Sequence, residues 1–217
     1  MTDAKPPSAR TRVKRLHEYA RYDRETIHAI LDAMPVAHVG YLVDGAPFVT
    51  PTLQWREGDR VFWHGSSASR LLKKATGADV CLTVTLVDAM VLARSGLNSS
   101  VNYRSAMVLG KAEAVSDGRE KVRHLETMME RMFPGRWATL RPASAQELKA
   151  TAVLSMPIEE ASAKVTSGMP KDDEPDYAWP VWAGLVPIRM EAGPPETDPR
   201  TLPGLAVPEH AKRYRIG

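Results

Sequence analysis

Two short segments of this 217-residue chain combine residue types that bind anions. Residues 61–73, V-F-W-H-G-S-S-A-S-R-L-L-K, pass from an apolar run through His64 into a loop of small residues, and Arg70 follows at the start of a helix-like stretch. Small residues let a backbone approach a ligand closely, and hydroxyl and N–H groups at a helix start favour phosphate oxygens. An arginine there can hold a phosphate through two donors. The predicted ligand contacts of this segment are His64, Gly65, Ser66, Ser67, Arg70 and Leu71.

The second segment, N-Y-R-S at 102–105, begins an apolar strand. Because it also supplies Arg and Ser, the two strand ends together predict one anion site. Strand alternation puts Tyr103 and Ser105 on one face and Arg104 on the other. A regular strand therefore cannot direct all three into one pocket, unless it carries a bulge or the site lies at the mouth of the strand.

These residues resemble the flavin-nucleotide-binding proteins of the pyridoxamine 5′-phosphate oxidase-like family, with the nitroimidazole-resistance (Nim-type) branch most similar. The resemblance covers roughly residues 22–187. The motifs on which it rests are W-H-G-S-S-A-S-R-L-L, S-V-N-Y-R-S-A-M-V-L-G, F-P-G-R-W with R-P-A-S-A-Q-E-L-K-A-T-A-V-L-S-M-P-I, and S-A-K-V-T-S-G-M-P. The resemblance implies a mainly β (α+β) fold, an FMN-binding split β-barrel with peripheral helices that forms a homodimer and holds FMN between its subunits.

The family pattern also implies roles for individual residues. His64 matches the Nim-type histidine that lies beside the flavin, and Tyr103 to Ser105 match a second phosphate-facing strand, with Arg104 able to act across the dimer interface. The strand segment Thr50, Pro51 and Thr52 is expected at the rim of the isoalloxazine ring. Trp182 is expected to approach the flavin from the other subunit. True pyridoxamine phosphate oxidases carry further basic residues near the C-terminus that this chain lacks, so vitamin B6 oxidation is not expected.

The elements that must position these residues can be predicted from periodicity and turn signals. Asp23 begins a helix that Pro35 ends, and Ser144 with Glu147 forms a capping box. Further helices are predicted over 69–76 and 120–132. Strands are predicted over 36–42, 47–55, 61–64, 80–88, 103–115 and 151–160. Residues 161–176 are expected to form a polar loop. Many short strands with few helices are typical of a barrel or sandwich.

The chain divides into three parts. Residues 1–20 are polar and basic and predict a flexible N-terminal arm. Residues 21–190 form the predicted FMN-binding domain, and residues 191–217 a proline-rich C-terminal extension that packs on the body or on a partner.

Composition excludes several functional classes. With 43% hydrophobic and 25% charged residues and a net charge of +3, the chain reads as a globular protein without a nucleic-acid partner. One cysteine, Cys81, cannot form an internal disulfide, and the histidines show no metal-binding spacing. No apolar stretch is long enough to span a membrane and no signal-peptide core is visible, so a cytoplasmic location is expected.

Three functions fit this reading. The first is an FMN-dependent oxidoreductase that takes electrons from a reduced donor and passes them to a small nitroaromatic or quinone-like acceptor beside His64. The second is a non-catalytic flavin carrier or sensor, motivated by the basic arm and the long extension. The third and weakest is haem binding, since some split-barrel relatives hold haem, with His64 as the ligand.

Overall fold

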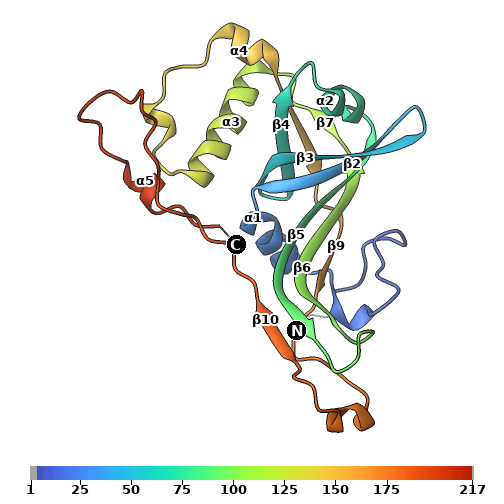
Figure 1. The fold of residues 1–217 in the computed structure, drawn as a ribbon. Coiled ribbons are helices and arrows are strands. Elements are labelled where there is room, and N and C mark those ends of the chain that lie inside the picture. The colour runs from blue at the N-terminus through green and yellow to red at the C-terminus, as the bar shows by residue number, and fades with distance from the viewer. Residues whose placement is uncertain (1–3, 217) are drawn as a thin grey trace.

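Antiparallel strands make up most of the fold. The computed structural model of the chain describes residues 4–216. Within that range ten strands form one sheet in the order β1-β9-β6-β5-β2-β3-β4-β8-β7, with β10 added beside β5 (Figure 1). The strands are β1 (Ala20–Arg21), β2 (Val36–Val43), β3 (Ala46–Glu57), β4 (Arg60–Ser66), β5 (Asp79–Leu92), β6 (Ser100–Lys111), β7 (Glu113–Ala114), β8 (Thr151–Pro157), β9 (Glu160–Val165) and β10 (Gly184–Pro187).

Helices begin where the sequence supplies capping side chains. The Asp23 carboxylate accepts from the Thr26 N–H at 2.8 Å, and Ser144 forms the predicted reciprocal capping box with Glu147. The Asp117 carboxylate accepts from two N–H groups in the same way at the start of the longest helix. The helices are α1 (Arg24–Ala33), α2 (Arg70–Ala75), α3 (Gly118–Met132), α4 (Ala145–Ala150) and α5 (Glu209–Lys212). None of the helices within residues 4–216 has the length and apolar character needed to cross a bilayer.

The sheet curls so that one stretch of chain contributes strands to two distant parts of the strand order. β7 follows β6 after one residue, Ala112, yet pairs with β8 at the far end of the strand order. Ala112 accepts a hydrogen bond from the Gly77 N–H at 2.8 Å and donates one to the Ala78 carbonyl at 3.0 Å. Because the continuous stretch from β6 to β7 pairs with β9 and β5 in one part of the sheet and with β8 in the other, the sheet curls into a barrel.

Strand alternation creates two separate apolar cores. Val61 and Trp63 of β4 point into the barrel and are fully buried. Phe62 points outward instead, where it packs with Trp55 of β3 and Met128 of α3. Helix α3 therefore covers the outer face of β3, β4 and β8, and this outer core lies next to the predicted site (Figure 1).

The structure corrects part of the predicted element pattern. Residues 160–165 form strand β9 between β6 and β1, where the start of a polar loop was expected. β5 is one 14-residue strand with a bulge between Val87 and Ala89. β6 starts at Ser100, three residues earlier than predicted.

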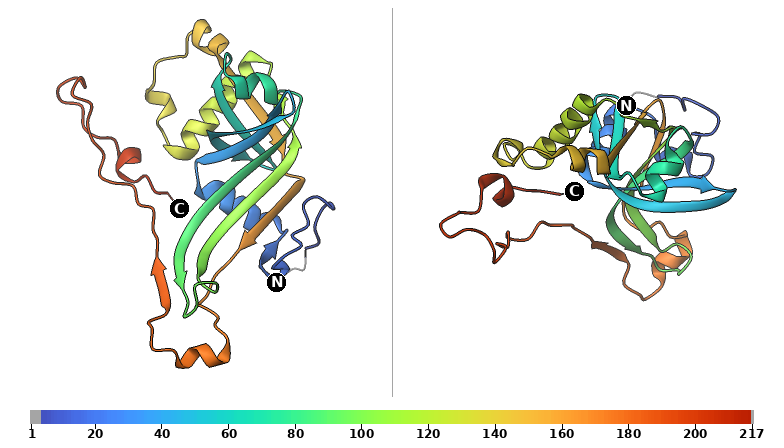
Figure 2. Two further views of the ribbon diagram at one scale, coloured as in Figure 1. Left: turned by 45° about the vertical axis from the view of Figure 1, so that its right-hand side comes forward. Right: turned by 90° about the horizontal axis from the view of Figure 1, so that it is seen from above.

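The two terminal segments differ in how they meet the barrel. Thr11, inside the predicted arm, is 1% exposed, and Arg10 pairs with Glu160 of β9, so the described part of the arm packs on the body. Residues 188–208 lead away from the barrel before α5 turns the chain back towards α1 (Figure 2).

Candidate functional site at the end of strand β4

His64 lies on the outer face of β4, on the same side as Phe62 and next to the core under α3. The Trp55 ring stands edge-on to it, with 6.0 Å between ring centroids and 61° between planes. Burial lowers the pKa of His64 below its ordinary value of 6.5. Its Nδ1 atom is buried and has no hydrogen-bond partner within residues 4–216. His64 is therefore a neutral imidazole near pH 7, the form that can ligate a metal or take part in hydrogen bonding, and its buried Nδ1 leaves Nε2 as the nitrogen that would meet a ligand.

Gly65 allows helix α2 to pack directly on the strand. A Cβ atom at this position would lie 3.0 Å from Leu72 Cδ2. Leu72 is 4% exposed and belongs to the barrel core, so it has little freedom to move. The small residue thus positions α2 beside the site; a role in approaching a ligand stays a prediction.

The loop after Gly65 satisfies many of its own polar groups. The Ser67 N–H donates to the Ala150 carbonyl at 2.8 Å, and the Ser69 N–H donates to the Ser66 carbonyl at 2.9 Å. The Ser66 hydroxyl accepts from the Ala68 N–H at 3.2 Å. The Ser67 N–H is therefore not free for a phosphate, although both hydroxyls lie in exposed residues.

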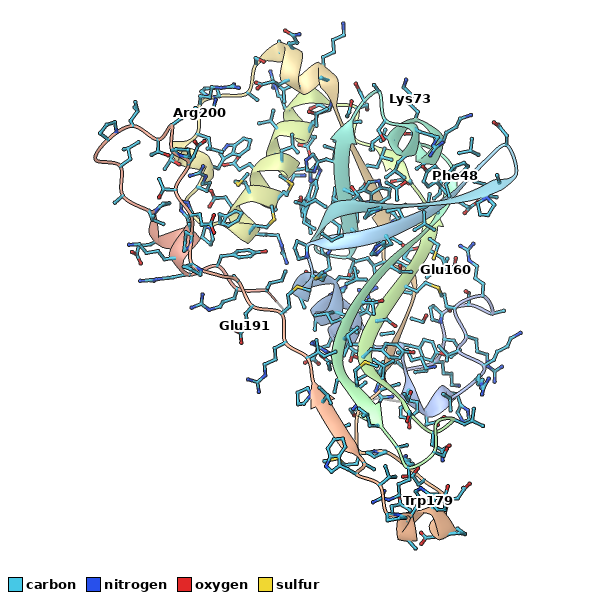
Figure 3. All side chains as sticks on the ribbon, in the orientation of Figure 1. Phe48, Lys73, Glu160, Trp179, Glu191 and Arg200 are labelled. Atoms are coloured by element: carbon cyan, nitrogen blue, oxygen red, sulfur yellow. The ribbon has the colours of Figure 1, made fainter. Side chains whose placement is uncertain are left out.

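Arg70 is the least compensated charge at the site. Its guanidinium lies 4.1 Å from the Phe48 ring centroid, and no acidic side chain in the described chain pairs with it. Helix α2 has only six residues, so the positive charge of Arg70, and not a helix dipole, is the main attraction for an anion here. Lys73 lies exposed on the same helix (Figure 3).

The other predicted contacts near β4 fall into two groups. Leu71 is 3% exposed inside the barrel core, so it supports α2 and is not available to a ligand. The Thr52 hydroxyl donates to the His64 carbonyl at 3.3 Å, and the Thr50 hydroxyl lies 3.2 Å from the Tyr41 hydroxyl. Pro51 is exposed between them, on the outer face that also carries His64.

Within one chain, the second predicted segment does not join the first. β5 and β2 lie between β6, which carries Tyr103 to Ser105, and β3. Arg104 forms a two-pronged ion pair with Asp88, at 2.9 to 3.2 Å, so its charge is already neutralised. Within one chain the two segments are therefore separate, and a single anion site formed by both would need a second chain; that site stays a prediction.

Trp182 lies at the opposite end of the molecule from α2. It precedes β10, which pairs with the last residues of β5, and it is 64% exposed. Trp179, three residues earlier, marks this tip in Figure 3, far from Phe48 and Lys73. Trp182 can reach a flavin near His64 only from a second subunit, as the sequence prediction requires.

Two further features of this region could not be predicted from the sequence. One is Trp55, which is buried against His64; its position depends on the register of β3 with β4, which no local pattern reveals. The other is a cavity of about 520 Å³ between the C-terminal residues and the body, which Trp55 also lines. Its charged lining residues are Asp32, Arg56, Arg131, Glu209, Arg213 and Arg215.

Comparisons with known proteins place this geometry in context. A family model described as pyridoxamine 5′-phosphate oxidase matches residues 23–165. The flavocytochrome Anf3 from Azotobacter vinelandii is 55% identical, with a TM-score of 0.96, over 99% of this chain and 100% of that one. An FAD- and haem-binding protein from Mycobacterium smegmatis is 34% identical, with a TM-score of 0.86, over 91% and 98%. A search of curated proteins found no match.

A more distant structure bears on the fold alone. A proposed 5-nitroimidazole antibiotic resistance protein from Bacteroides thetaiotaomicron is 23% identical, with a TM-score of 0.55, over 67% of this chain and 86% of that one. Together with the family match, it confirms the predicted mainly β split-barrel architecture.

Proposed function

Because the chain belongs to the pyridoxamine 5′-phosphate oxidase family, we propose that it is a flavin-binding redox protein that also takes haem, with His64 as the central residue of the site. The observation that carries the proposal is the His64 imidazole, which is largely buried and has an unpartnered Nδ1 atom. Two relatives above 30% identity support it, one a flavocytochrome and the other a protein that binds FAD and haem.

The flavin would be held by the end of β4 and by α2. Arg70 offers an unpaired guanidinium to a phosphate, and the exposed Ser66 and Ser67 add hydroxyls. The sequence predicted FMN, whereas the M. smegmatis relative binds FAD. FMN and FAD share the isoalloxazine ring and the first phosphate, so these residues could bind either cofactor. We favour FAD because of that relative.

The haem proposal depends on the state of His64. An iron ligand must be a neutral imidazole, and burial keeps His64 neutral by lowering its pKa. Bound haem would supply an iron that accepts and returns single electrons, and the flavin a centre that accepts pairs. Electrons from a reduced donor would then pass to a small acceptor, for which the predicted nitroaromatic and quinone-like compounds are the first to test.

A second copy of the chain is the partner that we propose. The outer faces of β2, β3 and β5 expose several apolar side chains, and such a cluster is typical of a protein–protein interface. These residues are Val36, Leu42, Val49, Val87, Met90 and Leu92. A homodimer through this face would cover them and could bring Trp182 of one copy towards His64 of the other.

The test compares two histidine variants. His64→Ala should abolish haem binding, seen as loss of the Soret band after reconstitution, yet retain flavin. His17→Ala is the matched control, because its imidazole is 83% exposed and should change neither cofactor. A His64→Ala protein with an unchanged Soret band would contradict the proposed ligand. The mass of the flavin released by acid would distinguish FAD from FMN.

A further inference from the structure

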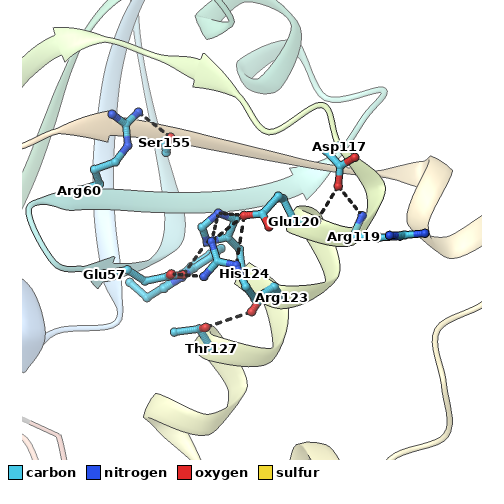
Figure 4. Close-up of polar contacts among 10 residues, drawn as sticks. Glu57, Arg60, Asp117, Arg119, Glu120, Arg123, His124, Thr127 and Ser155 are labelled. Carbon is cyan, nitrogen blue, oxygen red and sulfur yellow. Dashed lines mark hydrogen bonds and ion pairs between the residues drawn. The ribbon is translucent and has the colours of Figure 1, made fainter.

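A single carboxylate joins helix α3 to the strand pair that carries His64. Glu57 Oε1 accepts from the Trp55 indole N–H at 2.8 Å and lies 2.8 Å from His124 Nδ1 (Figure 4). Its other oxygen is 3.3 Å from Arg123 Nη1. Trp55 is 4% exposed and His124 8%, so these bonds lie in the outer core and not in solvent.

The hydrogen-bond partners assign the ring proton of His124. A carboxylate oxygen only accepts, so Nδ1 must carry a proton to bond Glu57. Arg123 Nη2 lies 3.0 Å from Nε2 and can only donate. His124 is thus fixed at both nitrogens, and through Glu57 it fixes the direction of the Trp55 indole N–H.

Trp55 is held on its faces as well as at its N–H. It stacks on Phe62, with 5.6 Å between centroids and 19° between planes, and Phe62 in turn packs on the His124 ring at 4.3 Å. The remaining edge of Trp55 meets His64. The indole therefore has no freedom to rotate without breaking the Glu57 bond or the Phe62 stack.

A histidine that binds a metal is usually oriented by a hydrogen bond from its other ring nitrogen to a carboxylate or carbonyl. No side-chain hydrogen bond of His64 is found within residues 4–216, and its buried Nδ1 is unpartnered. The Trp55 ring, whose centroid lies 6.0 Å from that of His64, is the aromatic neighbour that packs against the imidazole. Packing must supply the orientation that hydrogen bonding does not.

We propose that Trp55 is a positioning residue for His64, and that Glu57, anchored by His124 and Arg123 of α3, holds Trp55 in place. The proposal rests on the proposed function only for what His64 binds; the contact and its effect on the His64 ring belong to the chain itself. Helix α3 thereby acts on the geometry of the site through Glu57.

The test uses two readouts of the full-length protein. Haem affinity should fall about 10- to 100-fold in Trp55→Leu, the range typical when the support of a metal ligand is removed, and less in Trp55→Phe. Glu57→Ala should lower haem affinity and Glu57→Gln should restore it, because an amide oxygen still accepts the indole N–H. Trp179→Leu is the matched control, since Trp179 is 67% exposed at the far tip.

The second readout separates this proposal from the proposed function. In the cofactor-free protein, the NMR signals of the His64 ring protons should shift or broaden in Glu57→Ala and keep their positions in Glu57→Gln, because an indole without its N–H acceptor no longer holds the imidazole in one orientation. This result decides the matter even if the parent binds no haem. His64 ring signals that stay unchanged in Glu57→Ala would overturn the proposal, and so would a loss of haem affinity without that change. If Trp55→Leu fails to fold, Trp55→Phe and Glu57→Ala carry the same comparison.

Discussion

At the scale of single residues, the site depends on a charged side chain and an imidazole ring that have few bonding partners within the described residues. Within residues 4–216, Arg70 lies over the Phe48 ring and pairs with no acidic side chain, and His64 packs against Trp55 and makes no side-chain hydrogen bond. Both side chains are therefore free to bind a ligand without breaking an existing ion pair. Arg104, which the sequence also offered, is not, because Asp88 already neutralises it.

Removing the Arg70 guanidinium should weaken flavin binding. We expect Arg70→Ala to weaken the free energy of flavin binding by about 1.5–3 kcal/mol, the usual contribution of a hydrogen bond to a charged group. Lys73→Ala is the control, since Lys73 is exposed on the same short helix and has no assigned contact. Fluorescence titration with FAD and FMN measures both. Equal flavin affinity in Arg70→Ala and the parent would show that the phosphate lies elsewhere.

The lowered pKa of His64 also makes a prediction for stability. Between its lowered folded pKa and the ordinary value of 6.5, the unfolded chain binds a proton that the folded chain does not. The free energy of unfolding should therefore fall as pH drops below about 6.5. His28, whose pKa is lowered first by burial, adds to this slope. In urea unfolding between pH 7.5 and 5, the free energy of unfolding of His64→Gln should fall less steeply with pH than that of the parent. Equal pH dependence in the two proteins would contradict this prediction.

At the scale of elements, the starts and caps of helices could be predicted from the sequence better than the pairing of strands. Asp23, Ser144 and Glu147 sit where local chemistry placed them, because a cap depends only on its own turn. β9 was missed because S-A-K-V reads as polar, and only pairing with β6 on one side and β1 on the other makes it a strand. The contact between Trp55 and His64 depends on strand register, so sequence could not supply it.

One ion pair should hold the loop that carries the exposed tryptophans. Arg94 donates to Asp172 from both its backbone and its side chain, at 3.0 and 3.1 Å, and also lies over the Tyr177 ring. The Asp172 side chain is fully buried, so Arg94→Gln removes its counter-charge. Limited proteolysis should then cut residues 166–183 faster. Arg200→Gln, at a 92% exposed arginine, should not change the rate; equal cutting of the parent and Arg94→Gln would refute this role.

At the scale of the whole molecule, the proposed homodimer would account for apolar surface that one chain leaves exposed. Apolar residues on the outer sheet face and Trp182 at the distal tip have no partner within residues 4–216 that explains them. We expect light scattering to give the mass of two chains, and Val49→Asp to shift it towards one. Leu97→Asp is the control, because Leu97 is 98% exposed in the loop between β5 and β6. A parent that remains a single chain at high concentration would exclude the dimer.

The visible absorption spectrum of the purified protein, before and after reduction and after reconstitution with FAD, FMN and haem, is the first measurement to make. We expect flavin absorption together with a Soret band, and loss of the Soret band alone in His64→Ala. A protein that retains neither flavin nor haem after reconstitution would contradict this expectation.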